Sequence, residues 1–259
     1  MIYVGTSGYS YKDWVGPVYP EGTKTSDMLE VYAERFDTVE LNFTYYGMPT
    51  RQGMQGMADK TPEGFQFFVK ANKATTHEYD RGGSVPFLKA LTPLQETNKL
   101  AGVLCQFPNS FKNNERSRRY LSEVKDDFDG HNVVIEFRDR SWENDAVYGF
   151  LERLNLGYCA VDEPALPGLV RAVPRVTSSS GYIRFHSRDA DKWYGGDGKE
   201  RYNYNYSEEE LKEWLPRTQE MDADPKSENL FVFFNNCHAG HAAVNALQFQ
   251  EMLRELGLI

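Results

Sequence analysis

Short apolar runs, rich in β-branched and aromatic residues, recur along the chain, and each ends on polar side chains. Seven such runs lie at residues 39–42, 67–70, 103–106, 134–138, 160–162, 183–186 and 231–236. An eighth run, residues 2–4, opens the chain and leads into Gly5-Thr6-Ser7-Gly8. Runs of this length and composition are typical of buried strands. The pattern therefore predicts eight strands with polar groups at their C-terminal ends.

Segments with helical periodicity lie between the predicted strands. Apolar residues recur on one helical face over residues 26–36, 85–100 and 144–154, and a last helix is predicted over residues 239–256. Ser207-Glu208-Glu209-Glu210 has the pattern of a capping box, which marks the start of another helix. This alternation favours a parallel sheet with helical crossovers. Eight repeats without a Gly-rich or Ser-rich linker predict an α/β fold, a single (β/α)8 TIM barrel over residues 1–259.

One unit, after the sixth strand, departs from the alternation. Several prolines between residues 162 and 181 are incompatible with a long helix, so we expect a loop there. Long connections also follow the first strand, over residues 7–24, and the seventh strand, over residues 187–206. Loops at the C-terminal ends of barrel strands carry the site in TIM-barrel enzymes, which makes these segments candidate lids.

The polar strand ends are predicted to converge inside the barrel. Side chains two residues apart share a face of a strand, and the outer face, covered by helices, must be apolar. In the fifth strand, Ile135 is thus expected to face the helices and Glu136 the interior. The residues predicted to meet at the C-terminal mouth are Glu40, Asn42, Lys70, Gln106, Glu136, Arg138, Asp162, Arg184, His186 and one of Asn235 and Asn236. The alternative is a structural lattice of buried ion pairs, such as Glu136 with Arg184, that carries no chemistry.

Composition and charge narrow the class of protein. A chain that is 40% hydrophobic and 26% charged is typical of a soluble globular protein, and no apolar stretch approaches the length that spans a bilayer. The net charge of −9 argues against a surface that coats nucleic acid. Cys105, Cys159 and Cys237 form an odd, widely spaced set, and the N-terminus has no signal-peptide pattern. We therefore expect buried free thiols and a cytoplasmic protein.

Several motifs at the strand ends resemble those of one protein family. They are Gly5-Thr6-Ser7-Gly8-Tyr9, Thr38-Val39-Glu40-Leu41-Asn42, Phe68-Val69-Lys70-Ala71 with His77, Gln106-Phe107-Pro108, Glu136-Phe137-Arg138 with Ser141-Trp142, Arg184-Phe185-His186 and Phe233-Phe234-Asn235-Asn236. On these segments, which span almost the whole chain, the protein resembles the DUF72 (YecE-like) family. The resemblance implies a TIM barrel, similar to endonuclease IV and related sugar-phosphate enzymes, and a site rather than a particular reaction. Two departures are Tyr9, where Trp is usual, and Ser187, where Gly is common and where the change would alter loop closure.

A metal-assisted phosphoesterase is the activity that the likeness to endonuclease IV first suggests. Such sites gather several His and carboxylates around a zinc cluster, whereas this chain has five His and no His-x-His or Glu-x-x-His spacing. His131 precedes the fifth strand and is expected at the opposite end of the barrel. We therefore predict no metal and no other cofactor. The alternative is a single divalent ion held by residues among Glu40, His77, Glu136, Asp162, His186 and His238.

Metal-free chemistry on an anionic ligand fits the residues better. Lys and Arg side chains at the mouth can hold a phosphate or carboxylate, and backbone N–H groups near Ala239 and Gly240 can add to that site. A carboxylate can act as general base and a histidine can transfer protons. The predicted catalytic residues are Glu136, His186 and Asp162. The predicted substrate-binding residues are Glu40, Asn42, Lys70, His77, Gln106, Arg138, Trp142, Arg184, Tyr194, Asn235 and Asn236.

The long connection over residues 187–206 interleaves basic and aromatic residues, a composition that can follow a nucleic-acid strand by charge and stacking. Its four basic residues are matched by four acidic ones, and Gly195-Gly196-Asp197-Gly198 supplies flexibility. We therefore predict a lid over a small ligand, with nucleic-acid contact as the alternative.

These features lead to one functional hypothesis and one rival. The hypothesis is a hydrolase-type or lyase-type enzyme that acts on an anionic small molecule or sugar phosphate, with no membrane partner. The rival is a non-catalytic protein that binds a ligand or a nucleic-acid end at the same mouth. The sequence does not predict the oligomeric state.

Overall fold

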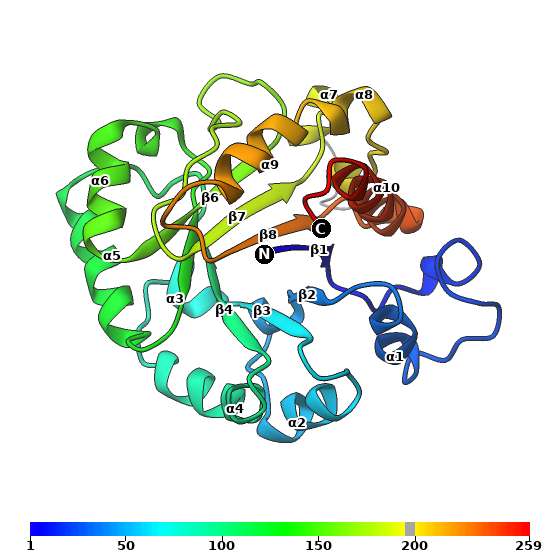
Figure 1. Ribbon diagram of the computed structural model, residues 1–259. Coiled ribbons are helices and arrows are strands. Elements are labelled where there is room, and N and C mark those ends of the chain that lie inside the picture. The colour runs from blue at the N-terminus through cyan, green and yellow to red at the C-terminus, as the bar shows by residue number, and fades with distance from the viewer. Residues whose placement is uncertain (195–199) are drawn as a thin grey trace.

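Eight parallel strands close into a barrel in the computed structural model, which describes residues 1–194 and 200–259. The strands are β1 (Ile2–Ser7), β2 (Thr38–Leu41), β3 (Gln66–Lys70), β4 (Leu100–Gln106), β5 (Val133–Glu136), β6 (Leu156–Asp162), β7 (Ser180–Phe185) and β8 (Asn229–Phe234). Each strand pairs with the next along the chain, and β8 closes the sheet on β1 with Val4 opposite Val232. The predicted TIM barrel is confirmed (Figure 1).

Helices follow the strands, and most of them cover the outside of this barrel (Figure 1). They are α1 (Met28–Ala33), α2 (Arg51–Asp59), α3 (Lys73–Thr76), α4 (Ser84–Glu96), α5 (Glu115–Asp127), α6 (Asp145–Arg153), α7 (Ala190–Tyr194), α8 (Glu208–Lys212), α9 (Leu215–Asp222) and α10 (His241–Glu255). The predicted capping box begins α8, because Ser207 Oγ accepts the Glu210 N–H at 3.2 Å while Glu210 Oε2 accepts the Ser207 N–H at 2.8 Å. In the described part of the chain, none of the helices has the length and apolar character needed to cross a bilayer.

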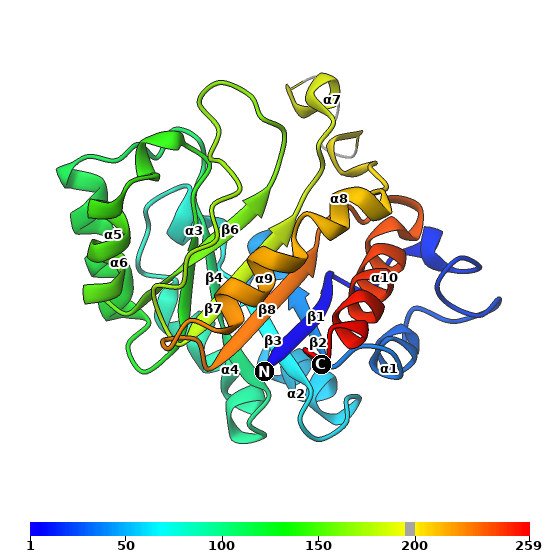
Figure 2. The same cartoon turned by 45° about the horizontal axis from the view of Figure 1, so that its top comes forward.

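The connection after β6 is irregular, as the prolines predicted. Residues 163–179 form no helix or strand, and all of them are described. This segment and α7 stand beyond the end of the barrel towards which β6 and β7 point (Figure 2). The connection after β6 and the described start of the connection after β7 therefore lie at the C-terminal mouth.

Aromatic rings fill the interior of the barrel below its mouth. The Phe68 ring lies 4.7 Å from that of Tyr182 and 4.9 Å from that of Phe231, and Tyr3 stacks on Phe231 at 5.0 Å. Gly102 makes room for this cluster, because a Cβ there would lie 2.7 Å from the Phe68 ring. The interior is thus a packed core rather than a pore. The polar residues of the interior, such as Glu136 and Arg184, lie near the C-terminal ends of their strands.

The three cysteines are buried and free, as expected. Cys105 and Cys159 lie in β4 and β6, and Cys237 follows β8.

Candidate functional site

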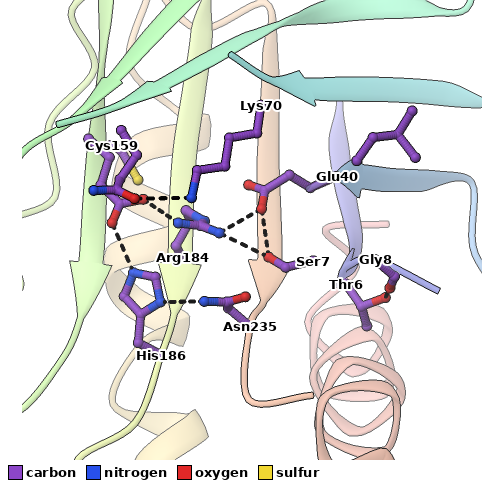
Figure 3. A network of polar contacts seen from close by, with 12 residues as sticks. Thr6, Ser7, Gly8, Glu40, Lys70, Cys159, Arg184, His186 and Asn235 are labelled. Atoms are coloured by element: carbon purple, nitrogen blue, oxygen red, sulfur yellow. Dashed lines mark hydrogen bonds and ion pairs between the residues drawn. The ribbon is translucent and has the colours of Figure 1, made fainter. Parts of the chain in front are cut away.

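A guanidinium held between two carboxylates forms the floor of the mouth. Arg184 Nη2 on β7 lies 2.6 Å from Glu40 Oε1 on β2, and Arg184 Nη1 pairs with Glu136 Oε2 on β5. Glu40 also accepts hydrogen bonds from Ser7 Oγ at 2.8 Å and from Tyr182 Oη at 2.6 Å. Figure 3 shows Glu40, Ser7 and Arg184 pointing towards one another from different strands. Glu40, Glu136 and Arg184, the deepest residues of the mouth, thus form a lattice of buried ion pairs, which is the alternative to a catalytic role given above.

Glu136 links this floor to the upper part of the mouth. Its Oε1 lies 2.6 Å from Arg138 Nη2 and 3.2 Å from His186 Nε2. Burial alone would raise the pKa of Glu136, but Arg138 and Arg184 outweigh it and hold the pKa well below its ordinary value. Glu136 is therefore a permanently ionised carboxylate with its charge neutralised by two guanidinium groups.

His186 is a buried, neutral imidazole. His186 Nδ1 lies 3.0 Å from Asn235 Nδ2, and His186 Nε2 lies 3.2 Å from both Glu136 Oε1 and Arg138 Nη2. Burial, together with the nearby Arg138 guanidinium, lowers the pKa of His186 to about 3. The imidazole is therefore uncharged near pH 7.

Glu163 belongs to the site although the sequence pattern does not predict it there. Arg138 Nη1 donates to Glu163 Oε2 at 2.8 Å, and the Glu163 side chain is fully buried. Its other oxygen, Oε1, has no hydrogen-bond partner among the described residues. Burial raises the pKa of Glu163 to about 7, although Arg138 opposes this shift. Glu163 directly follows the end of β6, and this position is a signal that it lies near the mouth. The direction of its side chain cannot be predicted, because strand alternation does not apply beyond the strand.

Lys70, at the end of β3, contributes an ammonium group to the mouth. Its Nζ donates to Gln106 Oε1 at 3.0 Å and lies 4.6 Å from the centre of the Tyr45 ring. Burial and the charge of Arg184 lower the pKa of Lys70 to about 8. No carboxylate of the described residues forms an ion pair with it.

Two further predicted residues lie beside this group. His77 packs edge-on against Tyr45 at 5.2 Å and is half-buried; its burial and the charge of Lys70 lower its pKa. Asn42 directly follows β2, and its Oδ1 is buried with no partner among the described residues. Asn42 thus follows the end of β2, and His77 follows α3, the short helix after β3.

The connection after β7 covers one side of the mouth. The Arg138 guanidinium lies 5.8 Å from the Trp193 ring, and His186 lies 6.3 Å from the Tyr202 ring. Arg201 stacks on Trp193 at 4.8 Å and donates to its carbonyl. Tyr194, predicted to bind substrate, is instead 67% exposed, and its neighbour Trp193 makes the contacts. The predicted flexible stretch 195–198 lies outside the described residues.

Asp162, predicted to be catalytic, lies on the opposite face of β6. Its carboxylate accepts from Trp214 Nε1 at 2.6 Å, from Tyr206 Oη at 2.8 Å and from Arg188 Nη2 at 2.8 Å. These partners belong to the chain after β7, on the outside of the barrel. Asp162 thus anchors that connection, and its oxygens are occupied.

Trp142 and Asn236 also lie away from the mouth. Trp142 is buried against Phe137 at 4.3 Å and donates to the Phe111 carbonyl, so it packs behind β5. Asn236 faces outward and donates to Asn245 Oδ1 at 2.8 Å. Of the two asparagines left open by the sequence, Asn235 is therefore the one that reaches His186.

The predicted anion site before α10 is partly occupied by the protein itself. The Ala239 N–H donates to Asp13 Oδ2 at 2.8 Å. A carboxylate from the connection after β1 thus takes one of the donors that a ligand would need.

The residues considered for a metal do not all lie together, and those that do, Glu40, Glu136 and His186, surround a guanidinium. Arg184 neutralises both Glu40 and Glu136, and Asp162 faces the other side of β6. Over residues 1–194 and 200–259, no group of three or more His, Cys, Asp or Glu is arranged to hold an ion.

Comparison with known proteins agrees with this fold. The family model described as "Protein of unknown function DUF72" matches residues 3–257. The chain belongs to the DUF72 family. It is 32% identical to the UPF0759 protein YunF of Bacillus subtilis strain 168, over 98% of this chain and 95% of that protein.

Two DUF72 crystal structures resemble the whole chain. A DUF72 protein of Thermotoga maritima is 40% identical, with a TM-score of 0.90 over 98% of this chain and 99% of that one. A DUF72 protein of Enterococcus faecalis is 28% identical, with a TM-score of 0.87 over 98% of this chain and 96% of that one. These relatives are named for their family, and their names carry no activity.

Proposed function

We propose that this DUF72 protein is an enzyme of hydrolase or lyase type that acts on a small anionic molecule, such as a sugar phosphate. The single observation that carries the proposal is the pair formed by Arg138 and Glu163, 2.8 Å apart. It combines a cation that can hold an anionic group with a carboxyl group whose pKa is about 7.

The charges of the site favour an anionic ligand. The two carboxylates Glu40 and Glu136 are matched by Arg184 and Arg138, and the third carboxyl group, that of Glu163, carries only part of a negative charge near pH 7. Lys70 adds a positive charge with no acidic partner in the described part of the chain. The Arg138 side chain is 10% exposed, and Lys70 is partly exposed as well. Both cations can therefore contact a ligand at the mouth.

Glu163 is the best candidate for proton transfer. With a pKa of about 7, it is present in both protonation states near neutral pH, and its Oε1 has no described partner. Glu136 stays ionised and holds Arg138, Arg184 and His186 in place, which is a positioning role. His186 lies beside Glu136 and Arg138 as an uncharged imidazole.

Ligand binding and turnover test the proposal separately. We would measure the binding of glycerol 3-phosphate, ribose 5-phosphate and glucose 6-phosphate by calorimetry, and follow product formation by NMR. Arg138→Met should weaken binding about 10- to 100-fold, because a charged hydrogen bond is lost. Glu163→Gln should preserve binding and slow turnover about 100-fold or more.

Glu63→Gln is the matched control, because Glu63 is exposed and precedes β3 at the other end of the barrel. Unchanged affinity in Arg138→Met would contradict the proposed site. Tight binding without turnover of any ligand would favour the binding-protein rival. Binding of a DNA oligonucleotide more tightly than of these phosphates would favour a nucleic-acid ligand.

A further inference from the structure

Lys99, which is buried, and Lys70, which is partly buried, differ in how many hydrogen-bond acceptors their amines have. Lys99 Nζ donates to the carbonyls of Ala58 and Thr61, both at 2.6 Å, and to Thr61 Oγ1 at 3.2 Å. All three of its N–H groups have acceptors, as expected for a lysine that only supports the fold. Lys70 Nζ has one described acceptor, Gln106 Oε1. The Lys70 amine therefore retains the capacity to bind something else.

The surroundings of Lys70 favour its neutral form. Burial lowers the pKa of Lys70 most, and the positive charges of Arg184 on β7 and Arg138 after β5 lower it further. Glu136 and Glu40 raise this pKa but do not offset the effect of burial. With a pKa of about 8, about a quarter of the amine is unprotonated at pH 7.5, against about a thousandth for an exposed lysine. Gln106 fixes the position of Nζ, and Tyr45 covers it on one side. A desolvated lysine beside other cations is the arrangement that activates an amine nucleophile.

We propose that the Lys70 amine forms an imine with the carbonyl group of a phosphorylated aldehyde or ketone. This inference rests on the proposed function, since Arg138 would hold the phosphate. It narrows the reaction from hydrolase or lyase to chemistry of the lyase type.

The imine step balances without an oxidant or a metal. The Nζ lone pair adds to the carbonyl carbon and gives a carbinolamine. The carbon–oxygen bond then breaks, and the oxygen leaves as water with the two amine protons. The resulting C=N group, once protonated, withdraws electrons from the adjacent carbon–carbon or carbon–hydrogen bond. Lysis of that bond needs a proton acceptor or donor, which is the role proposed for Glu163.

Reductive labelling tests the inference. The protein is incubated at pH 7.5 with glyceraldehyde 3-phosphate and sodium borohydride, which delivers hydride to the imine carbon and makes the adduct permanent. Peptide mass spectrometry then gives the labelling rate of each lysine. Lys70 should be labelled at least ten times faster than Lys89, which is exposed on α4. The rate at Lys70 should rise with pH around a midpoint of about 8.

Two variants and one further aldehyde act as controls. Lys70→Arg keeps the charge but removes the nucleophile, so the fast adduct should disappear while labelling at Lys89 is unchanged. Lys89→Arg should leave the fast adduct intact. Glyceraldehyde, which lacks the phosphate, should label Lys70 more slowly, and Arg138→Met should abolish the preference for the phosphorylated aldehyde.

The outcomes separate this inference from the proposed function. Labelling of Lys70 no faster than that of Lys89 would overturn the imine. If glycerol 3-phosphate still binds and depends on Arg138, the anion-binding enzyme stands without it. Fast labelling of Lys70 with no phosphate preference and no glycerol 3-phosphate binding would instead overturn the anionic substrate class.

Discussion

Arg184 and Glu40 form an ion pair of 2.6 Å in which both side chains are almost completely buried. The remaining Glu40 contacts, to Ser7 and Tyr182, join β1, β2 and β7 at one point inside the barrel. A buried pair of this kind adds little net stability, but loss of one partner leaves an uncompensated charge. The pair therefore fixes the geometry of the mouth more than it strengthens the fold.

Glu40→Gln should destabilise the protein by about 3–5 kcal/mol, because Glu136 is then the one carboxylate of the described residues that still pairs with Arg184. Urea unfolding measured against Glu63→Gln checks this value, since the control carries the same chemical change at an exposed site. Tyr182→Phe removes one neutral donor to Glu40 and should cost less. A loss below about 1 kcal/mol in Glu40→Gln, the range of exposed pairs, would contradict the buried geometry.

Asp162 and Glu163 are adjacent in the sequence, yet we expect a change at Asp162 to affect stability and a change at Glu163 to affect turnover. Asp162→Asn weakens the acceptors for Trp214 and Arg188, so it should cost about 2–4 kcal/mol of stability and leave ligand affinity unchanged. Thermal or urea unfolding, with calorimetry of the ligand, measures both effects. Asp126→Asn, exposed on α5, is the control. If Asp162→Asn abolished turnover in a stable protein, Asp162 would be catalytic, as its position at the end of β6 predicts.

Strand alternation predicted the interior residues wherever one face of a strand is polar. In β5 and β7 the polar series Glu136, Arg184 and His186 points inward, and the structure brings these three together. Alternation failed at β6, because its interior residue is Cys159, which lies beside Arg184 (Figure 3). With both faces of β6 apolar, the polarity of Asp162 gave no information about its direction.

The residues that sequence could not identify lie beyond the regular strands. Glu163 follows β6 in an irregular segment, and Trp193 lies on the short helix α7, so neither has a period from which its direction follows. Their roles depend on tertiary contacts with Arg138, at 2.8 Å for Glu163 and 5.8 Å for Trp193. The prediction that Trp142 binds substrate was uncertain for another reason. A tryptophan beside a polar motif is as suitable for packing as for binding, and here its ring packs against Phe137.

The pKa of Glu163 makes stability depend on pH in a defined direction. Because the folded-state value of about 7 lies above the ordinary 4.5, the folded protein binds the proton more tightly than the unfolded chain. The contribution of Glu163 is complete below about pH 4.5 and is lost as the pH rises through 7. Glu163→Gln should therefore gain about 3 kcal/mol relative to the wild type between pH 4.5 and pH 8. Urea unfolding at both pH values checks this, and a pH-independent difference would show that Glu163 titrates normally.

Removal of metal ions should not affect this site. The carboxylates nearest the mouth are already paired with guanidinium groups, and Asp162 faces away from them. Protein dialysed against a chelator should therefore keep both its unfolding midpoint and its affinity for glycerol 3-phosphate. A specific ion present at 100 times its Kd would instead stabilise the folded state by about 2.7 kcal/mol, which a melting curve detects easily. Stoichiometric zinc or manganese in protein purified without chelator, lost in Glu136→Gln but kept in Asp162→Asn, would place a metal in the mouth and make metal-assisted phosphoester hydrolysis the better proposal.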